Sequence, residues 1–361
     1  MSRLSTEDAQ VRYNYAPGPA QLPPEVVAEA AEAVRSFPPH GRSILELSHR
    51  STDFSVIAEQ AEADLRALLT IPDDYAVLFL NGGARVHYTL WVQNLSAPDD
   101  RIGLVDSGFW SQQAIEEARK LREIRVLPDS PDPADYPDLA PADTDGLAFL
   151  HYVSNETLTG LAMPAPQAVC PLVCDRTSDF LSGPFDIRPY ALCYAGSQKN
   201  FGTAGLTVLV ARRDCLREET GLAPGLSYAA QARTGCLYHT PPIYAWYVSA
   251  LMLHWIREQG GLEEMERRAR TRASLVYDCI DASSLYANAI APRARSRMNV
   301  CFTLADSGLE TAFLQQAETA GLIGLRGHKV TGGMRASLYN AMPVTGAEAL
   351  VEFMRDFERK A

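Results

Sequence analysis

The chain has 361 residues, 47% of them hydrophobic, which is enough to bury a core and fits two or three domains. Its 33 basic against 44 acidic residues give a net charge of −11, which argues against nucleic acid or an anionic membrane as a partner. No apolar run approaches the roughly 18 residues of a membrane span, and the start MSRLSTEDAQ lacks a signal-peptide pattern. We therefore expect a cytoplasmic protein that binds neither nucleic acid nor a membrane.

The cysteines and lysines set further limits. Seven cysteines form an odd, scattered set with no CxxC pair, so the sequence indicates neither disulfides nor a metal site. Only four of the 33 basic residues are lysines, and the rest are arginines. A lysine in an unusual place is therefore worth a separate explanation.

In chain order, the first predicted elements are two amphipathic helices, at residues 25–37 and 56–69, where apolar residues recur at helical spacing. Short apolar runs then alternate with helical stretches such as residues 111–121. Their lengths predict the strands of a mixed or mostly parallel sheet covered by helices on both faces. The runs begin at Ala76, Arg101, Glu123, Gly146, Pro171, Ala191 and Gly205.

The pattern changes in the last third of the chain. Long helical patterns begin near Pro242 and Gly261, and a strand, helix, strand, helix order follows Asp281. This order predicts a small C-terminal α+β domain. We expect residues 1–23 to form an N-terminal segment that packs with the small domain, residues 24–260 the large domain, and residues 261–361 the small domain.

Polar residues at the ends of the predicted strands are the first candidates for a site, because ligands of open α/β sheets gather at the carboxyl edge. The loop NGGAR (residues 81–85) follows a strand and precedes a helix, where free N–H groups could hold a phosphate. Such glycine turns are common, so this signal alone decides nothing. Asp106 and Asp175 each end a strand, and either is a helix cap or a site residue.

Two lysines need an explanation. Lys199, in AGSQKNFGTAG, directly follows a buried apolar run, and an ammonium group removed from water must be paired or neutralised. Lys329 lies in GHKVTGG near Arg326 and Arg335, where an anion is the obvious partner. A buried lysine, an aspartate at the end of an earlier strand and a phosphate-binding loop together match the needs of pyridoxal phosphate.

The chain resembles the phosphoserine aminotransferase family, class-V enzymes of fold-type I, from residue 16 to near residue 359. The resemblance rests on ELSHRS (46–51), FLNGGAR, DSGFW, HYVSNETLTG, AGSQKNFGTAGLT, YHTPPIYAWY, SRMNV and GHKVTGGMRASLYNAMP. It implies an α/β fold-type I pyridoxal-phosphate transferase: a large domain with a mixed, mostly parallel seven-stranded sheet flanked by helices, and a small α+β domain. The implied reaction, as in serine biosynthesis, exchanges an amino group between glutamate and 3-phosphohydroxypyruvate.

The resemblance also implies roles for the cofactor residues. Lys199 matches the Schiff-base lysine that shuttles the proton, Asp175 the partner of the pyridinium nitrogen, and Trp110 the aromatic ring stacked on the cofactor, although an ordinary core tryptophan remains an alternative. A neighbouring subunit contributes to the phosphate site in the family, so we expect a homodimer with shared active sites. The remaining cofactor positions are Ala84, Arg85, Thr157, Gln198, His239 and Thr240, the last two from the neighbouring subunit.

For the substrate, the resemblance implies that Arg335 binds the α-carboxylate in a bidentate manner. Substrate phosphate is assigned to two pairs of basic residues. Such local groups of basic residues would let a protein with a negative net charge bind acidic substrates. The two pairs are His49 with Arg50 and His328 with Lys329.

Several positions depart from the family pattern and leave alternatives open. They are consistent with a related acidic substrate in a specialised pathway. A lyase on the same scaffold would use the same lysine and aspartate, and a non-catalytic scaffold protein is a third alternative. The departures are Pro17, Ala84, Arg176, Gly183, His239 and Lys329.

Overall fold

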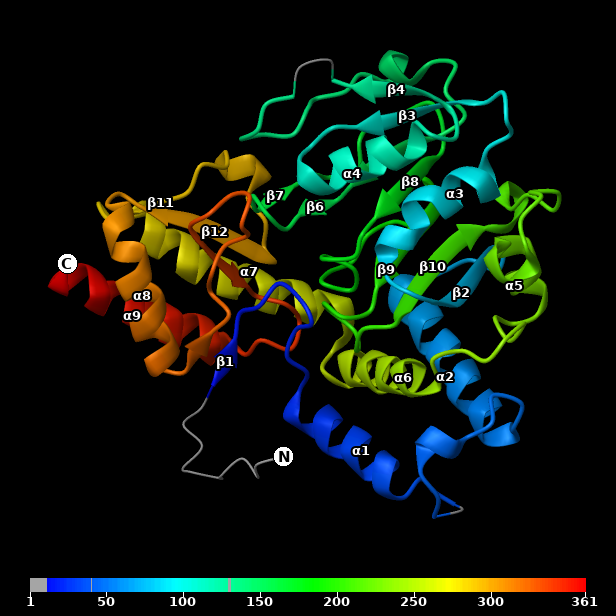
Figure 1. The fold of residues 1–361 in the computed structure, drawn as a ribbon, viewed down its shortest axis with the longest axis horizontal. Helices are drawn as coiled ribbons and strands as arrows, with labels where there is room; N and C mark the ends of the chain where they lie inside the picture. The colour runs from blue at the N-terminus through cyan, green and yellow to red at the C-terminus, as the bar shows by residue number, and fades with distance from the viewer. Residues whose placement is uncertain (1–11, 40, 129–130) are drawn as a thin grey trace.

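The computed structural model describes residues 12–39, 41–128 and 131–361. In Figure 1 the large domain, blue to green, lies beside a small domain in yellow to red. Residues 1–11 of the predicted N-terminal segment lie outside the described residues. Among the described residues, no helix is long and apolar enough to cross a bilayer.

A seven-stranded sheet forms the centre of the large domain, in the order β2-β10-β9-β8-β5-β3-β4. Strand β10 is antiparallel to both of its neighbours, and the other pairs are parallel. The predicted mixed, mostly parallel sheet is therefore confirmed, and each predicted apolar run overlaps one strand. The strands are β2 (Tyr75–Asn81), β3 (Arg101–Val105), β4 (Glu123–Leu127), β5 (Leu150–Val153), β8 (Leu172–Asp175), β9 (Tyr190–Gly196) and β10 (Leu206–Arg212).

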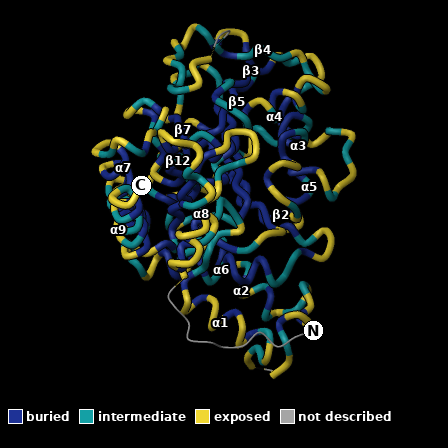
Figure 2. The backbone as a smooth tube through the Cα atoms, turned by 60° about the vertical axis from the view of Figure 1, so that its left-hand side comes forward, coloured by how far each residue is buried: buried dark blue, intermediate teal, exposed yellow. Residues whose placement is uncertain are grey.

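Helices cover this sheet, whose central strands are largely apolar. Every residue of β9 is buried, as expected for a strand with a helix layer on each face. In Figure 2 most residues of the central strands are coloured as buried. The helices of this domain are α1 (Pro24–Arg35), α2 (Thr52–Leu69), α3 (His87–Leu95), α4 (Phe109–Ala118), α5 (Tyr228–Arg233) and α6 (Ile243–Glu258).

Helix α2 illustrates how the sequence sets a local boundary and a packed face. The Ser51 side chain accepts a hydrogen bond from Phe54 N–H and caps the start, and Thr70 ends the helix in the left-handed conformation. Phe54 meets the edge of Trp246 from α6 at 5.3 Å between ring centroids, and Trp246 stacks on Phe79 of β2 at 4.6 Å. These aromatic contacts fix α2 and α6 against the sheet.

The small domain contains the antiparallel sheet β11-β12-β14 packed with three helices. Its core centres on Phe313, which meets Phe302, Phe353 and Phe357 edge-on. The predicted α+β character of the C-terminal region is thus confirmed. The elements are α7 (Gly261–Asp281), β11 (Tyr286–Ala287), β12 (Asn299–Leu304), α8 (Glu310–Thr319), β14 (Met334–Ser337) and α9 (Val344–Lys360).

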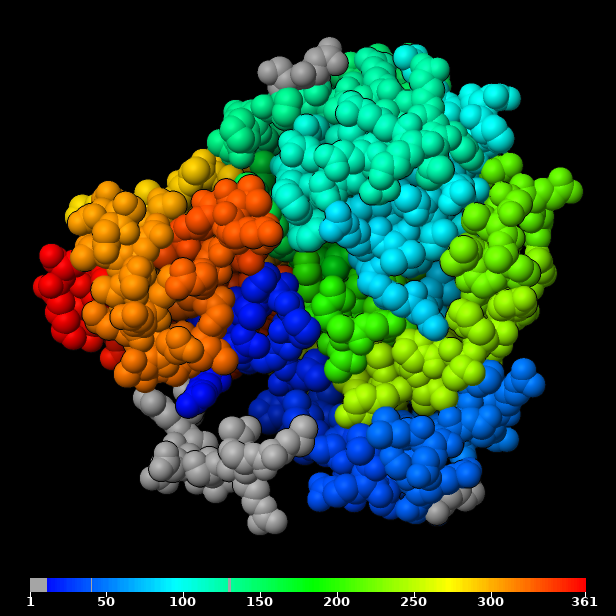
Figure 3. Space-filling model, in the orientation of Figure 1, coloured from blue at the N-terminus to red at the C-terminus, as the bar shows by residue number. Residues whose placement is uncertain are grey.

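The described part of the N-terminal segment packs with the small domain. Strand β1 (Tyr13–Asn14) pairs in parallel with β13 (Leu322–Ile323), and Tyr15 is fully buried in the small-domain core. In Figure 3 this segment, in dark blue, lies between the orange small domain and the green and cyan large domain. The predicted domain limits at residues 23 and 260 stay predictions, since α7 contributes residues to both cores.

Candidate active site

A cavity of about 580 Å³ lies at the carboxyl ends of β5, β8 and β9, the edge where the sequence placed a site. The small domain supplies part of its wall, and residues 17–19 of the N-terminal segment supply another part. Nine of the predicted site residues line this cavity: Ala84, Arg85, Trp110, Thr157, Asp175, Gln198, Lys199, His328 and Arg335.

Asp175 is the last residue of β8, and its carboxylate is held by two neighbours. Thr177 N–H donates to Oδ1 at 2.9 Å, and the Tyr88 hydroxyl donates to Oδ2 at 3.2 Å. Burial raises the pKa of Asp175, while the bonds from Thr177 and Tyr88 and the charge of Lys199 counter that rise. The site therefore favours a carboxylate whose remaining partner is a cation.

Lys199 lines the same cavity as Asp175 and lies in the turn that follows β9. Burial lowers the pKa of its ammonium group to about 8, with Asp175 opposing this shift and Arg335 adding to it. About a tenth of such a lysine is an unprotonated nucleophile at pH 7. Gly18 passes so close that a Cβ there would lie 3.4 Å from Lys199 Cγ, and Ala20 N–H donates to the Gln198 carbonyl.

Trp110 forms another wall of the cavity, and its indole is fixed in place. Its Nε1–H donates to Thr157 Oγ1 at 2.9 Å. Lys199 Nζ lies 5.9 Å from the centroid of the indole ring. Trp110 is only partly buried, so it presents a free ring face to the cavity rather than filling the core.

The glycine loop runs from β2 into α3. Gly82 has φ of 103°, a conformation that favours glycine, and Ala84 begins the short 3-10 turn Ala84–Val86 before α3. Ala84 is not among the described non-glycine residues with positive φ, so alanine fits here without backbone strain. The first N–H groups of a helix have no carbonyl partner within it, which makes this turn a suitable phosphate cradle.

Arg335, on β14, brings a buried positive charge to the small-domain side of the cavity. Its Nη1–H donates to the Thr157 carbonyl at 2.9 Å, while Nε is buried with no hydrogen-bond partner among the described residues. Burial lowers the pKa of its guanidinium. Such a group fits a planar carboxylate that can take two parallel hydrogen bonds. His328 lies nearby, 5.6 Å from the Phe109 ring.

Five predicted site residues do not line this cavity. His49 is half-buried, and its Nε2 has no hydrogen-bond partner within residues 12–39, 41–128 and 131–361; the other four are exposed. Their assignments stay predictions, because a single chain does not bring them to the other site residues. The four exposed residues are Arg50, His239, Thr240 and Lys329.

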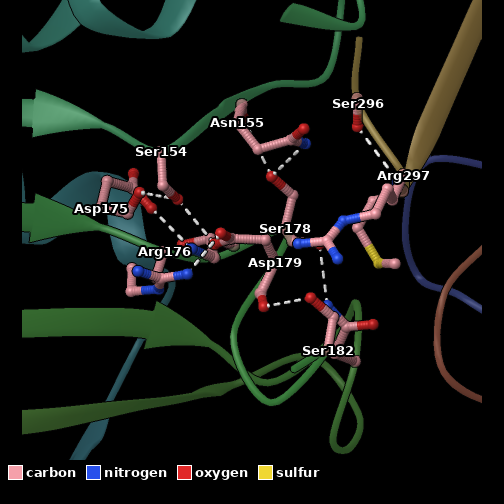
Figure 4. Close-up of polar contacts among 12 residues, drawn as sticks. Ser154, Asn155, Asp175, Arg176, Ser178, Asp179, Ser182, Ser296 and Arg297 are labelled. Carbon is pink, nitrogen blue, oxygen red and sulfur yellow. Dashed lines mark hydrogen bonds and ion pairs between the residues drawn. The ribbon is translucent and has the colours of Figure 1, made fainter. Parts of the chain in front are cut away.

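Two residues that depart from the family pattern, Arg176 and Gly183, make their contacts outside the cavity. Arg176 follows Asp175 in sequence, but its guanidinium forms an ion pair with Asp179 at 2.6 Å (Figure 4). The same guanidinium lies 3.9 Å from the Phe185 ring centroid. Burial opposes the charge of Arg176, yet Asp179 outweighs this and raises its pKa. At Gly183 a Cβ would lie 3.1 Å from Glu266 Cβ, so the small residue suits its packing.

Sequence reasoning missed three polar residues around the site. Tyr88 and Thr177 bind Asp175, and Glu156 binds the backbone at Trp110. Glu156 stands in the motif HYVSNETLTG, which was used only for Thr157. Tyr88 carries no comparable signal, because one tyrosine on a partly apolar helix looks like an ordinary core residue.

Comparisons with known proteins agree with this geometry. The family model for class-V aminotransferases matches residues 12–350. The phosphoserine aminotransferase of Acinetobacter baumannii (strain ATCC 17978) is 42% identical over 96% of this chain and 99% of that protein. That of Pseudomonas paraeruginosa (strain PA7) is 44% identical over 96% of this chain and 98% of that protein.

Solved structures give the same result. Phosphoserine aminotransferase from Bacillus circulans subsp. alkalophilus superposes with a TM-score of 0.93 at 37% identity, covering 98% of this chain and 99% of that one. The pyridoxal-phosphate-bound enzyme from Trichomonas vaginalis gives 0.90 at 30% identity, covering 96% of this chain and 100% of that one. The predicted fold-type I architecture is confirmed. The chain therefore belongs to the class-V aminotransferases and, within them, to the phosphoserine aminotransferase family.

Proposed function

We propose that this protein is a pyridoxal-phosphate-dependent aminotransferase that exchanges an amino group between glutamate and 3-phosphohydroxypyruvate, with phosphoserine as the product. The observation that carries the proposal is the meeting of Lys199, Asp175 and Trp110 in one cavity whose opposite wall holds the buried Arg335. The names of the relatives support the same reaction. A cytoplasmic location, expected from the sequence, is part of the proposal.

The residues present fit the cofactor. When bound, pyridoxal phosphate supplies a reactive aldehyde and a ring that accepts electrons. Asp175 would hold the ring nitrogen in its protonated form, and Trp110 would cover one ring face. Lys199 would bind the aldehyde carbon and carry the proton removed from the substrate Cα. The backbone of Ala84 and Arg85, with the Gln198 side chain, would hold the phosphate.

The substrate requires two anion-binding positions. Arg335 would bind the α-carboxylate, because the Nε–H of its buried guanidinium has no hydrogen-bond partner in the part of the chain that the structure describes, while Nη1 is held by the Thr157 carbonyl. The substrate phosphate would be held by His328, which lines the cavity, with the exposed Lys329 next to it in sequence, and by His49 with Arg50, which a neighbouring chain would supply. Lys329 supplies charge but lacks the planar fork of arginine, so its contribution would be mainly Coulombic.

We also propose a homodimer in which each chain completes the other's site. His239 and Thr240 are exposed and lie outside the cavity of their own chain, as expected for residues that serve a neighbouring subunit. Sedimentation should give a dimer. Mixed dimers of Lys199→Ala and Thr240→Ala chains should recover turnover that neither variant shows alone, and a fully active monomer would contradict the shared site.

The departures from the family pattern fall into two groups. Pro17 and Ala84 line the cavity, and His239 and Lys329 are assigned to the two phosphate positions. Arg176 and Gly183 make their contacts outside the cavity. The choice of the main reaction therefore rests on the site residues and on the relatives, not on the departures.

A half-reaction experiment tests the proposal. Glutamate added to the holoenzyme should remove the visible absorption of the lysine-bound cofactor, and 3-phosphohydroxypyruvate should restore it faster than pyruvate or oxaloacetate. Lys199→Ala should lack the visible band while remaining folded by circular dichroism. Undetectable turnover of the phosphorylated acid would refute the proposed substrate. Release of ammonia with the visible band retained would instead indicate a lyase.

A further inference from the structure

The first turn of helix α4 is held by a carboxylate from a distant part of the chain. The residue before the helix is Gly108, which has no side-chain oxygen to cap it. Glu156, from the short strand β6 (Asn155–Glu156), takes this role. Its Oε2 accepts Trp110 N–H at 2.9 Å and its Oε1 accepts Ser111 N–H at 2.8 Å. Both bonds satisfy N–H groups that a helix leaves unpaired at its start.

Gly108 makes this approach possible. Its φ is 151°, and a Cβ there would lie 3.0 Å from Glu156 Cδ. Any larger residue would push the carboxylate away from the helix end. Gly108 and Glu156 are therefore both required for this contact at the start of α4.

The same short segment holds both ends of Trp110. Glu156 binds the tryptophan backbone, and the next residue, Thr157, accepts the indole Nε1–H. Strand β6 pairs with β7 (Leu161–Ala162), which fixes the segment. Glu156 is fully buried and does not line the cavity, so it reaches the cavity only through residues that do.

Several charged or titratable groups face Glu156. Burial raises its pKa to about 7; the bonds from Trp110 and Ser111 oppose that shift, and Asp175 on β8 adds to it. Burial lowers the pKa of Lys199, after β9, and the Glu156 charge partly opposes this shift; burial raises the pKa of Tyr88, on α3, and the Glu156 charge adds to that rise. Asp106, after β3, is linked through the Ser111 hydroxyl at 3.5 Å. The carboxylate thus belongs to the electrostatic surroundings of Lys199 and Asp175 as well as to the helix.

We propose that Glu156 is a positioning residue for Trp110: by fixing the first turn of α4, its carboxylate sets the position in which the indole covers the bound cofactor ring. The inference rests on the proposed function only in taking Trp110 as the residue that covers the ring. Without the carboxylate, the indole would keep its bond to Thr157 but lose the fixed backbone from which it projects.

The test compares cofactor binding in Glu156→Gln, Trp110→Ala and the double variant. Glutamine keeps the shape but turns one acceptor oxygen into an NH₂ group facing an N–H donor. We expect about a tenfold increase in the Kd for pyridoxal phosphate, measured by fluorescence quenching of the apoprotein, because a charge-assisted hydrogen bond is lost. The circular dichroism of the bound cofactor in its visible band should fall by about half. The midpoint pH of that band should also fall, because a negative charge near Lys199 is gone.

The double variant separates positioning from a general loss of stability. If Glu156 acts through Trp110, Glu156→Gln should cause little further change in cofactor dichroism in the Trp110→Ala background, because that variant has no ring for the α4 backbone to place. Glu116→Gln, an exposed carboxylate on the same helix, is the matched control and should leave the dichroism and the Kd unchanged. If Glu156→Gln does not fold, Glu156→Asp replaces it, since it retains the charge but has a shorter reach, and its effect should have the same direction.

Two results would overturn the inference. One is an unchanged cofactor dichroism and Kd in folded Glu156→Gln, and the other is an equal effect on the dichroism with and without Trp110. A holoenzyme that binds the cofactor normally but fails to transaminate would refute the proposed function and leave this inference standing.

Discussion

Replacing Tyr88 with phenylalanine removes one hydroxyl group and keeps the ring, so it isolates a single hydrogen bond to Asp175. Both residues are buried, at 2% and 6% exposure, and the bond is 3.2 Å long. Hydrogen bonds to charged groups contribute roughly 1.5–3 kcal/mol. Because this bond is longer than the usual 2.5–3.0 Å, we take the lower limit of about 1.5 kcal/mol, or roughly one pKa unit.

The direction follows from the role of Asp175. Without the hydroxyl, the pKa of Asp175 rises further, so the carboxylate is a weaker partner for a protonated ring nitrogen. We expect the Kd for pyridoxal phosphate to increase about tenfold. The measurement is titration of the apoprotein with cofactor, followed by the visible band.

A matched control is Tyr75→Phe, another buried tyrosine, whose hydroxyl donates to the carbonyls of Ile187 and Tyr190. Tyr75 begins β2, whereas the cavity lies beyond the other end of that strand. Tyr75→Phe should lower the free energy of unfolding and leave the Kd unchanged. An unchanged Kd in Tyr88→Phe as well would refute the assigned role of this hydrogen bond.

Three further changes test other parts of the site and the core. Arg335→Lys should raise KM for both substrates by about ten- to a hundredfold, because lysine lacks the planar fork; equal KM values would exclude a bidentate contact. Lys329→Ala should raise KM for 3-phosphohydroxypyruvate only about two- to fivefold, since the group is exposed, and leave KM for oxaloacetate unchanged; steady-state kinetics measure both. Burial lowers the pKa of His151 to about 3, so below pH 6.5 the unfolded chain binds a proton that the folded chain does not, and stability falls as the pH falls. His151→Asn should therefore reduce the stability loss between pH 7 and pH 5 by about 2 kcal/mol in urea unfolding, and an unchanged pH dependence would show that His151 is not buried in its neutral form.

The strands illustrate what local sequence determines. A strand buried on both faces must be apolar along its whole length, and a run of five to seven apolar residues marks one wherever it occurs. Strand β3 is buried after its first residue and matches its predicted run residue for residue. The edge strand β4 also matches its run, although Glu123 and Arg125 interrupt its apolar residues and only Leu127 is buried. The run from Gly146 was longer than its strand: β5 begins at Leu150, because the earlier residues belong to the connection that enters the sheet.

Lys199 and Asp175 were also accessible from the sequence. A charged residue directly after a buried strand stands out against its apolar neighbours, and strand ends meet at one edge of a parallel sheet. Their shared cavity then follows from the order of β8 and β9, which are adjacent. The roles of Trp110 and Arg335 could be assigned only from the family resemblance, because neither residue directly follows a buried apolar run.

Other features depended on contacts between distant parts of the chain. Tyr88 reaches Asp175 across 87 positions, Glu156 reaches Trp110 across 46, and β1 pairs with β13 near the other end of the chain. The sequence by itself determined which segments are buried and where the reactive lysine and its aspartate emerge, because burial and strand ends leave marks within a few residues. Only the tertiary structure decided which side chains orient them, since a hydrogen bond between distant segments imposes no pattern on either segment alone.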